Sequence, residues 1–314
     1  MRIFPNVHEI RSLLGDRYIK QYLFAGDKVV LLDSGVIDTP ESQIYPYLEK
    51  IGIAPGNLSM VIAMHADGDH HGGLPAVKDA SISTLLACHP GDRELIEDPE
   101  CLYQKRYNFL AKDHHLGFGR ESMTYAPRKC KIDVLLSANE TIDLAPDWKL
   151  RVWHVPGHSA GHLAIYDEKN HAAFTSDAVH AEGCPTTTGS MSISPTYYAV
   201  DAYLATIRFL EHQPIEHIYS GHWPEYHGQQ VEDFLARSRK FVESADDLIK
   251  AYLSSNNRGV TLKELIHALS PKLGSWPEDR EDSLQFALYG HMVRLEHQKV
   301  VRSAKAAVVE YKLA

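Results

Sequence analysis

The chain has 314 residues, of which 44% are hydrophobic and 23% charged, as in a globular protein with one large domain and a small one. A formal net charge of −9 argues against a protein that binds nucleic acid over its whole surface. The N-terminus lacks the apolar core of a signal peptide, and no stretch approaches the roughly 18 apolar residues of a membrane span. We therefore expect a cytoplasmic protein without membrane contact, whose four scattered cysteines are free thiols.

The first part of the chain alternates strand-like and helix-like segments. Residues 17–35 predict two strands joined by a Gly-Asp turn, and residues 41–52 have helical spacing that ends at a glycine. Residues 57–65 predict a buried strand that ends at His65. Further strands are predicted at 83–89, 140–155, 162–177 and 215–222, and short helices at 76–80 and 91–99. Such an alternation is typical of layered α/β folds.

Residues 101–128 are aromatic and mixed in character, and we expect them to be partly helical. They form either a packed surface excursion or a lid over a pocket. Tyr107 and Phe118 in this segment, with His180 and Tyr197 further along, are candidates to bind an apolar or acyl part of a substrate. The alternative for the aromatic residues is burial in the core, which is the more common outcome.

After residue 230 the pattern changes to that of a smaller, mostly helical unit. Residues 229–255 predict a long helix. Two helices and two strands then follow, at 261–269, 282–298, 299–305 and 307–313. We therefore divide the chain into a domain of residues 1–230 and a helical linker with a small domain at 231–314.

The stretch MHADGDHHGG, residues 64–73, places four residues that bind metals well within six positions: His65, Asp67, Asp69 and His70. We expect Gly68, Gly72 and Gly73 to supply the positive φ angles that let them converge. Three more residues of this kind lie at or just beyond predicted strand ends, where sites of layered α/β proteins form: His158, Asp177 and His222. Such a set is too large for one catalytic zinc ion, but it fits two divalent ions that share a carboxylate.

This arrangement resembles the metallo-β-lactamase superfamily. The first motif of that family is H-x-H-x-D-H, followed by a His in a P-G-H turn, an Asp that ends a strand, and a His near the end of the domain. The matching segments here are 65–70, VPGH at 155–158, FTSD at 174–177 and SGH at 220–222. The resemblance covers residues 15–230 and implies an αββα sandwich.

The resemblance also implies a role for each candidate ligand. One metal would be held by His65, Asp67 and His158, and the other by Asp69, His70 and His222, with Asp177 bridging the two. Asp33, in the segment LLDSG, would support the site from behind its ligands. His162 is expected to be a structural neighbour of the site.

Asp67 departs from the family pattern, which has a histidine at this position. A third carboxylate reduces the positive charge of the site and favours harder ions such as manganese or iron. The flavodiiron branch of the superfamily binds iron and has a glutamate here, but this chain has no flavodoxin-like segment. Zinc remains the expected metal, with iron and manganese as alternatives. Asp67→His is predicted to be tolerated and to shift the preference toward zinc.

The resemblance implies a dinuclear metal-dependent hydrolase, in which a metal-bound hydroxide attacks a small ester, thioester or lactone. Asp69 is the expected catalytic residue, because it can orient the nucleophile and relay a proton. The alternatives are a non-heme di-iron redox protein and a phosphodiesterase or nuclease. No cluster of lysine or arginine accompanies the motif, so we expect a small-molecule substrate and not nucleic acid.

The C-terminal segment resembles a winged helix, with residues 282–298 in the place of the recognition helix. That helix is mostly apolar and acidic, and Arg294 is its only lysine or arginine. We therefore expect this helix to pack against the large domain, or in a homodimer interface, and not to bind DNA. The alternative is a metal-dependent regulator that binds nucleic acid through this helix.

Overall fold

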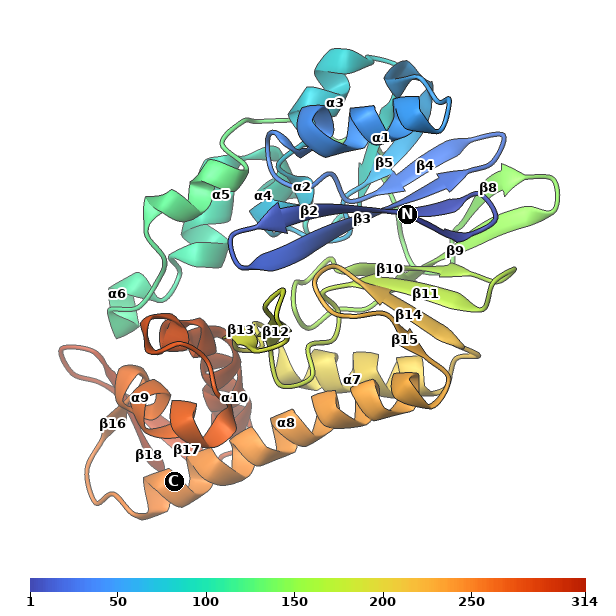
Figure 1. Ribbon diagram of the computed structural model, residues 1–314. Helices are drawn as coiled ribbons and strands as arrows, with labels where there is room; N and C mark the ends of the chain where they lie inside the picture. The colour runs from blue at the N-terminus through green and yellow to red at the C-terminus, as the bar shows by residue number, and fades with distance from the viewer.

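The computed structural model describes residues 1–314 and contains two β-sheets stacked face to face, with helices on both outer faces (Figure 1). The first sheet has its strands in chain order: β1 (Arg2–Phe4), β2 (Val7–Leu14), β3 (Arg17–Ala25), β4 (Val29–Leu32), β5 (Leu58–Ile62), β6 (Leu85–Cys88) and β7 (Val134–Leu135). The second has the order β15 (Tyr226–His227), β14 (His217–Ser220), β11 (Ala172–Ser176), β10 (Leu163–Asp167), β9 (Trp148–His154) and β8 (Thr141–Ala145). The predicted αββα sandwich is confirmed.

Helices cover the outer face of each sheet. They are α1 (Tyr45–Lys50) and α3 (Leu74–Ala80) on the first sheet, and α7 (Val200–Glu211) and α8 (Gln229–Ser254) on the second (Figure 1). Side chains alternate between the two faces of each strand. In β4, Val30 and Leu32 therefore pack between the sheets, whereas Leu31 packs beneath the helices. None of the helices has the length and hydropathy that a membrane-spanning segment needs.

The direction of the strands brings the candidate ligands to one edge of the sandwich. β11 and β14 are parallel, and β9 shares their direction because β10 is antiparallel to both β9 and β11. His158 follows the end of β9, Asp177 follows β11 directly, and His222 lies just beyond β14. In the other sheet, His65 follows β5. The four residues therefore lie beyond the carboxyl ends of their strands, as the sequence predicts.

Residues 93–125 leave the first sheet as a partly helical excursion. It consists of α4 (Arg93–Glu97), α5 (Pro99–Leu102), the helical turn η3 (Tyr103–Tyr107), α6 (Ala111–His114) and the 3-10 turn η4 (Arg120–Tyr125). Its end contacts the C-terminal part of the chain, where Lys305 Nζ lies 2.8 Å from Asp113 Oδ1. Phe109 stacks on Phe286 with ring centroids 6.2 Å apart. The excursion thus joins the sandwich to the C-terminal part.

The C-terminal part has the predicted order of two helices and two strands, with one additional short strand. Its elements are β16 (Val260–Thr261), α9 (Leu262–Leu273), the 3-10 turn η5 (Glu278–Leu284), α10 (Gln285–His297), β17 (Val301–Lys305) and β18 (Val309–Leu313). The capping box of Thr261 and Glu264 starts α9. The predicted domain boundary at residue 230 falls in the first turn of α8, and this boundary and the winged-helix resemblance stay predictions.

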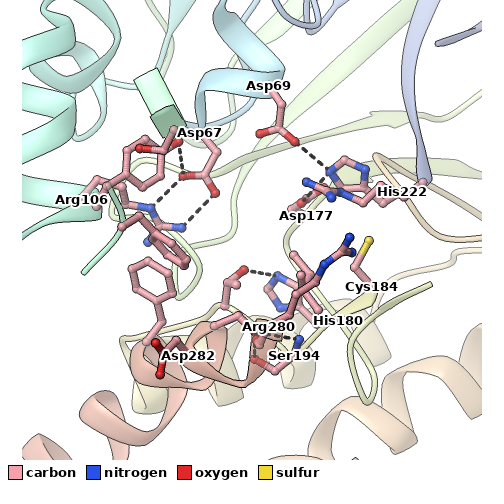
Figure 2. Close-up of a pocket in the computed structure, with 18 of the residues that line it drawn as sticks. Asp67, Asp69, Arg106, Asp177, His180, Cys184, Ser194, His222, Arg280 and Asp282 are labelled. Atoms are coloured by element: carbon pink, nitrogen blue, oxygen red, sulfur yellow. Dashed lines mark hydrogen bonds and ion pairs between the residues drawn. The ribbon is translucent and has the colours of Figure 1, made fainter. Parts of the chain in front are cut away.

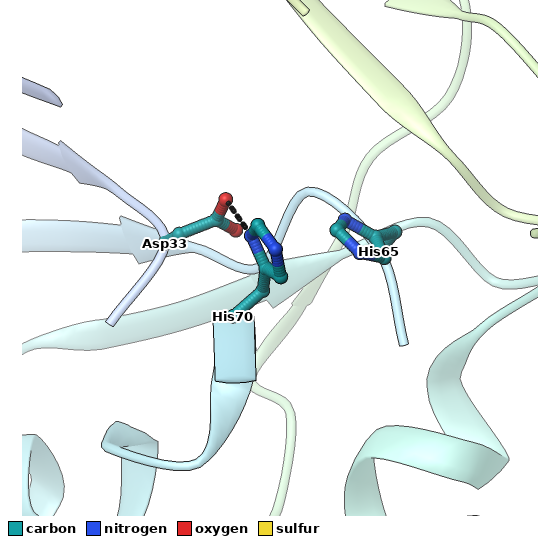
Figure 3. A group of neighbouring side chains, drawn as sticks. All are labelled: Asp33, His65 and His70. Atoms are coloured by element: carbon teal, nitrogen blue, oxygen red, sulfur yellow. Dashed lines mark hydrogen bonds and ion pairs between the residues drawn. The ribbon is translucent and has the colours of Figure 1, made fainter. Parts of the chain in front are cut away.

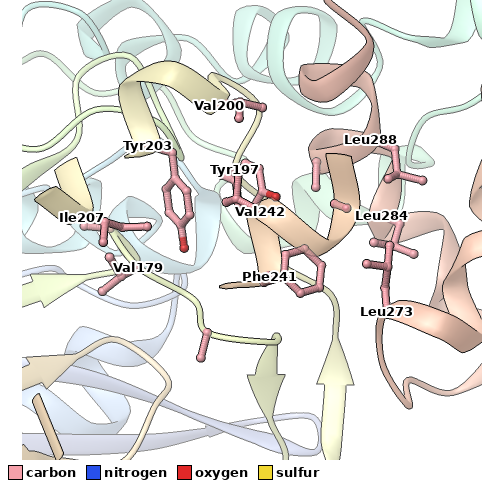
Figure 4. Packing of buried hydrophobic residues seen from close by; sticks show 14 of the residues in the cluster. Val179, Tyr197, Val200, Tyr203, Ile207, Phe241, Val242, Leu273, Leu284 and Leu288 are labelled. Atoms are coloured by element: carbon pink, nitrogen blue, oxygen red, sulfur yellow. The ribbon is translucent and has the colours of Figure 1, made fainter. Parts of the chain in front are cut away.

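One hydrophobic cluster runs from the large domain into the C-terminal part without a break. It contains 39 buried residues, among them Tyr197, Tyr203 and Phe241 (Figure 4). Helix α10 contributes Leu288 to this cluster, and its Gly290 lies against the backbone of Tyr198. The helix in the place of the recognition helix is therefore packed against the rest of the molecule.

Candidate metal centre and its pocket

The short helix α2 (Gly68–His71) carries half of the first motif. His65 and Asp67 lie in the segment before it, and Asp69 and His70 lie on its single turn. The glycines of the motif do not have the positive φ that we predicted, because Gly68, Gly72 and Gly73 all have ordinary backbone angles. They are required for close packing instead. A Cβ at Gly72 would collide with Tyr125 O, and one at Gly73 with Ser34 O.

The first cluster consists of His65, Asp67 and His158, as predicted. Asp67 Oδ2 lies 2.9 Å from His158 Nε2 and 3.8 Å from His65 Nε2. Both histidines are buried. One ligand atom from each residue lies within 4.8 Å of the others. Three nitrogen and oxygen atoms at this spacing can surround one divalent ion.

The second cluster consists of Asp69, His70 and His222. His222 Nε2 lies 3.4 Å from Asp69 Oδ2 and 3.2 Å from His70 Nε2. Asp177 lies beside this cluster, with Oδ1 3.6 Å from His70 Nε2. Its Oδ2 lies 3.5 Å from His222 Nε2 (Figure 2). Asp177 also forms a group with His158 of the first cluster and with His180. A single carboxylate therefore adjoins both clusters.

Unpaired buried atoms support the fit of these residues to metal ions. His65 Nε2 and Asp177 Oδ1 are buried without a hydrogen-bond partner. Such atoms are costly unless a ligand satisfies them. Imidazole and carboxylate groups are the usual protein ligands of zinc, iron and manganese. The donor set therefore fits divalent metal ions.

Asp33 lies behind the second cluster (Figure 3). Its Oδ2 accepts hydrogen bonds from His70 Nδ1 and from Ser176 Oγ, each at 2.8 Å, and its Oδ1 accepts one from Met64 N at 2.8 Å. Asp33 and Ser176 both have positive φ, of 59° and 45°, a conformation that is costly outside glycine. Burial would lower the pKa of His70, but the carboxylates of Asp177, Asp33 and Asp69 hold it well above the ordinary value.

A tight turn holds His158 in the first cluster. Gly157 has a φ of 138°, and a Cβ there would lie 2.6 Å from Tyr203 Cα, so only glycine fits. Beyond the turn, Asp92 accepts a hydrogen bond from Gly161 N at 2.7 Å and another from Ser159 Oγ. The sequence analysis identified the Pro-Gly turn but not Asp92, which lies 66 residues before His158.

Arg106 is the principal residue of the site that the sequence analysis missed. Its Nε and Nη2 donate to the two oxygens of Asp67 at 2.8 and 3.1 Å, and its Nη1 donates to His158 O at 2.8 Å. Burial alone would raise the pKa of Asp67, but Arg106 and His158 hold it well below its usual value. The guanidinium also lies over the rings of Tyr198 and Phe286. Nothing in the local sequence distinguishes Arg106 from a surface arginine.

The two clusters open into a cavity of about 310 Å³ (Figure 2). Asp67, Asp69, Asp177 and His222 line one part of it, and Ser283 and Phe286 of the C-terminal part line another. Among the predicted substrate residues, Tyr107, Phe118 and His180 line this cavity.

Tyr197 does not line the cavity, so its assignment to the substrate site was wrong. Its side chain is fully buried and stacks on Tyr203 with ring centroids 4.3 Å apart. Its hydroxyl lies 2.8 Å from His291 Nε2 of α10. The neighbouring Thr196 lines the cavity instead. His162 lies behind His65, with ring centroids 4.5 Å apart, and adjoins neither cluster as a ligand.

The stacked sheets and the paired His/Asp clusters define a class of α/β proteins with a metal centre at one edge of a β-sandwich. Residues 14–222 match the family model described as the metallo-beta-lactamase superfamily. The chain belongs to this superfamily.

Two curated relatives match about half of the chain. Transcription termination factor FttA from Methanothermobacter thermautotrophicus is 29% identical over 163 residues, and hydroxyacylglutathione hydrolase from Roseobacter denitrificans is 28% identical over 163 residues. The matches cover 50% and 52% of this chain but 24% and 49% of the relatives. The chain therefore spans half or less of the length of these relatives.

Two solved structures are similar over the whole chain. A beta-lactamase domain protein from Burkholderia ambifaria has a TM-score of 0.77 at 15% identity and covers 100% of this chain and 93% of that one. A metallo-beta-lactamase family protein from Thermus thermophilus has a TM-score of 0.73 at 17% identity and covers 100% of both chains. At such identities the likeness shows the fold alone.

Proposed function

We propose that the protein is a hydrolase that binds two divalent metal ions and cleaves a small ester, thioester or lactone. The observation that carries this proposal is the pair of three-residue clusters, joined by Asp177, at the wall of a single cavity. His65, Asp67 and His158 would hold one ion, and Asp69, His70 and His222 the other. Two bound metal ions would activate a water molecule for attack and polarise the oxygen of the substrate.

The side chains around the clusters have separate tasks in this proposal. Asp69 lines the cavity and would orient the attacking water and relay its proton to the leaving group. Burial raises the pKa of Tyr107 well above its usual value, so this phenol keeps its proton and can donate a hydrogen bond to the substrate. Asp33 holds the ring of His70 and thereby sets which nitrogen faces the cavity.

The cavity supports a small-molecule substrate. Its volume of about 310 Å³ is within the usual range of small-ligand pockets. Phe118, Trp223 and Phe286 give it apolar walls. The relatives named hydroxyacylglutathione hydrolase act, by that name, on an acyl compound, which supports an ester or thioester here. Because α10 is packed against the large domain, we do not propose a nucleic-acid substrate by analogy with the transcription termination factor.

Zinc is the metal that we propose, with iron and manganese as the alternatives that the oxygen ligand of Asp67 introduces. Elemental analysis of the protein as purified tests this point. About two zinc ions per chain is the expected result for two catalytic metal sites. Two iron ions would make oxygen and reductant assays the next measurement, and no bound metal at all would contradict the proposal.

The activity is tested with a panel of small esters, thioesters and lactones. We expect turnover of at least one class by the metal-loaded protein, loss of that turnover after treatment with a chelator, and recovery when zinc is added back. Turnover that survives complete removal of metal would contradict a metal-dependent hydrolase.

A further inference from the structure

Arg17 brings a further positive charge to the wall of the cavity. It is the first residue of β3, directly after the turn that contains Asp16, and it lines the same cavity as Asp69 and His222. Its side chain is only 17% exposed. A guanidinium stays charged at this position, because its pKa is far above neutral pH even when it is buried.

The guanidinium of Arg17 has no carboxylate bound to it. Its Nε is buried without a hydrogen-bond partner, and its nearest ion-pair partner, Asp16 Oδ1, is 3.9 Å from Nη1. That distance is too long for a hydrogen bond. Asp16 instead accepts hydrogen bonds from Ser192 Oγ at 2.9 and 3.1 Å and from Arg280 Nη1 at 2.6 Å. Asp16 is therefore already paired, and Arg17 is not.

Arg106, in the same cavity, shows the opposite situation. Its guanidinium makes three short hydrogen bonds, to both oxygens of Asp67 and to His158 O. Two further carboxylates of the cavity, Asp279 and Asp282, come from the C-terminal part and are exposed, and neither forms an ion pair with Arg17. They are poorly placed to neutralise a buried cation.

Asp69 is the carboxylate whose charge acts most strongly on Arg17. In the proposed function, Asp69 is a metal ligand and its negative charge is shared with the ion. The donors of Arg17 then remain without a full negative charge in a cavity that admits small molecules. Leaving buried donors unsatisfied costs free energy, which an anionic ligand would recover.

We propose that Arg17 binds a carboxylate of the substrate, so that the compound cleaved is an ester, thioester or lactone that also carries a free carboxylate. This inference rests on the proposed function and specifies, in addition, that the substrate is negatively charged. The planar guanidinium binds a carboxylate through two parallel hydrogen bonds. With the reacting carbonyl at the metal clusters and the carboxylate at Arg17, two fixed points set the orientation of the substrate.

Two esters of equal chain length test the inference. 4-Nitrophenyl hydrogen glutarate ends in a carboxylate, and 4-nitrophenyl pentanoate ends in a methyl group. For the zinc-loaded protein we expect kcat/KM at least about tenfold higher for the carboxylated ester, as for one charge-assisted interaction. Arg17→Met should remove this preference without loss of bound zinc, and Arg17→Lys should keep part of it. Arg151→Met, at an exposed arginine of β9, is the matched control.

A binding measurement separates this inference from the proposed function. Calorimetry compares glutarate with butyrate, which has one carboxylate fewer, on the zinc-loaded wild-type protein and on Arg17→Met. If glutarate binds more tightly than butyrate and Arg17→Met loses this difference, the anion site is supported, even if neither ester is hydrolysed. An anion site without hydrolysis of either ester would count against the proposed activity and not against the anion site.

Two results would overturn the anion site. The first is that Arg17→Met retains the preference for the carboxylated ester, or that the wild-type protein shows no such preference. The second is an equal loss of activity on both esters together with a loss of zinc, which would mean that Arg17 supports Asp69 and does not bind the substrate.

Discussion

The two His/Asp clusters contain the same residue types, two histidines and one aspartate each, but they differ in what surrounds them. In the first cluster, Arg106 donates to both oxygens of Asp67, and its Nη2 lies 3.3 Å from His158 Nε2. In the second, the outer nitrogens of the histidines face acceptors. His70 Nδ1 donates to Asp33, and His222 Nδ1 lies 2.6 Å from Tyr18 O.

This difference indicates that the two clusters, although they have equal numbers of candidate ligands, would not bind a metal ion with equal affinity. A metal ion in the first cluster would share Asp67 with a guanidinium and would be repelled by its charge. An ion in the second cluster would be held by imidazoles that acceptors have already oriented and made more basic. We therefore expect the second cluster to bind metal first and more tightly.

Asp69→Ala gives the largest expected effect, because it breaks the stronger cluster. We expect turnover to fall at least about a hundredfold, since a metal ligand and a proton relay are lost together. Metal content should fall in the same preparation. Asp79→Ala is the control, because Asp79 is an exposed aspartate of α3 that pairs with Arg128. Turnover that Asp69→Ala leaves unchanged would remove the second cluster from the mechanism.

Asp67→His introduces the residue that is common in the family but leaves Arg106 without its carboxylate partner. The sequence analysis predicted that this change is tolerated. The structure gives a reason to expect a cost, because Arg106 is buried and would lose both hydrogen bonds to Asp67. We expect a loss of about 3 kcal/mol in the free energy of unfolding, measured with urea on the metal-free protein. The double variant with Arg106→Met should recover most of it. A single variant as stable as the wild type would show that the pair contributes nothing.

Arg106→Met should bring the two clusters closer in affinity. It frees both oxygens of Asp67 and removes a positive charge, so we expect the first cluster to bind zinc about tenfold more tightly. Titration against a competing chelator resolves the two binding constants. The second constant is the internal control and should not move. Two unchanged constants would mean that Arg106 does not limit the first cluster.

The release of protons on metal binding is the smallest expected difference. In the metal-free protein the carboxylates of Asp177, Asp33 and Asp69 hold the pKa of His70 well above its usual value, so a metal ion must displace a proton that this ring holds more firmly than a free imidazole does. Burial holds the pKa of His65 well below its usual value, and Asp67 is already ionised.

We therefore expect the second cluster to release about one proton per ion, and the first cluster less. The affinity of the second cluster should accordingly fall as the pH is lowered. Calorimetry in buffers of different ionisation enthalpy measures the protons released. Equal release at both clusters would contradict this assignment.

The sequence predicted which histidine and aspartate side chains come together but not the residues around them, for a physical reason. His158, Asp177 and His222 each follow a strand whose pattern is local, and strand direction then brings them to one edge. Arg106 contacts Asp67, which is 39 residues earlier in the sequence. Arg106 belongs to an excursion whose sequence has no hydrophobic periodicity. Only the packing of that excursion on the sandwich decides this contact.

Tyr197 is a second residue whose surroundings could not be predicted from the local sequence. An aromatic residue near a ligand segment can line a pocket or pack in the core, and the core is the more common outcome. Its burial depends on α8 and α10, which lie far along the chain, and on the hydrogen bond to His291. Local sequence contains no signal for that choice, because the deciding partners are tertiary.

The contribution of Phe286 to the cavity has a consequence for the order of events during synthesis. The last candidate ligand, His222, leaves the ribosome before the residues that close the cavity. At about 5–20 residues per second, translation of the roughly 60 residues between His222 and Phe286 takes several seconds. During that interval all the candidate ligands have been synthesised but the wall formed by α10 is missing, so both clusters are more open to metal ions than they are in the finished protein.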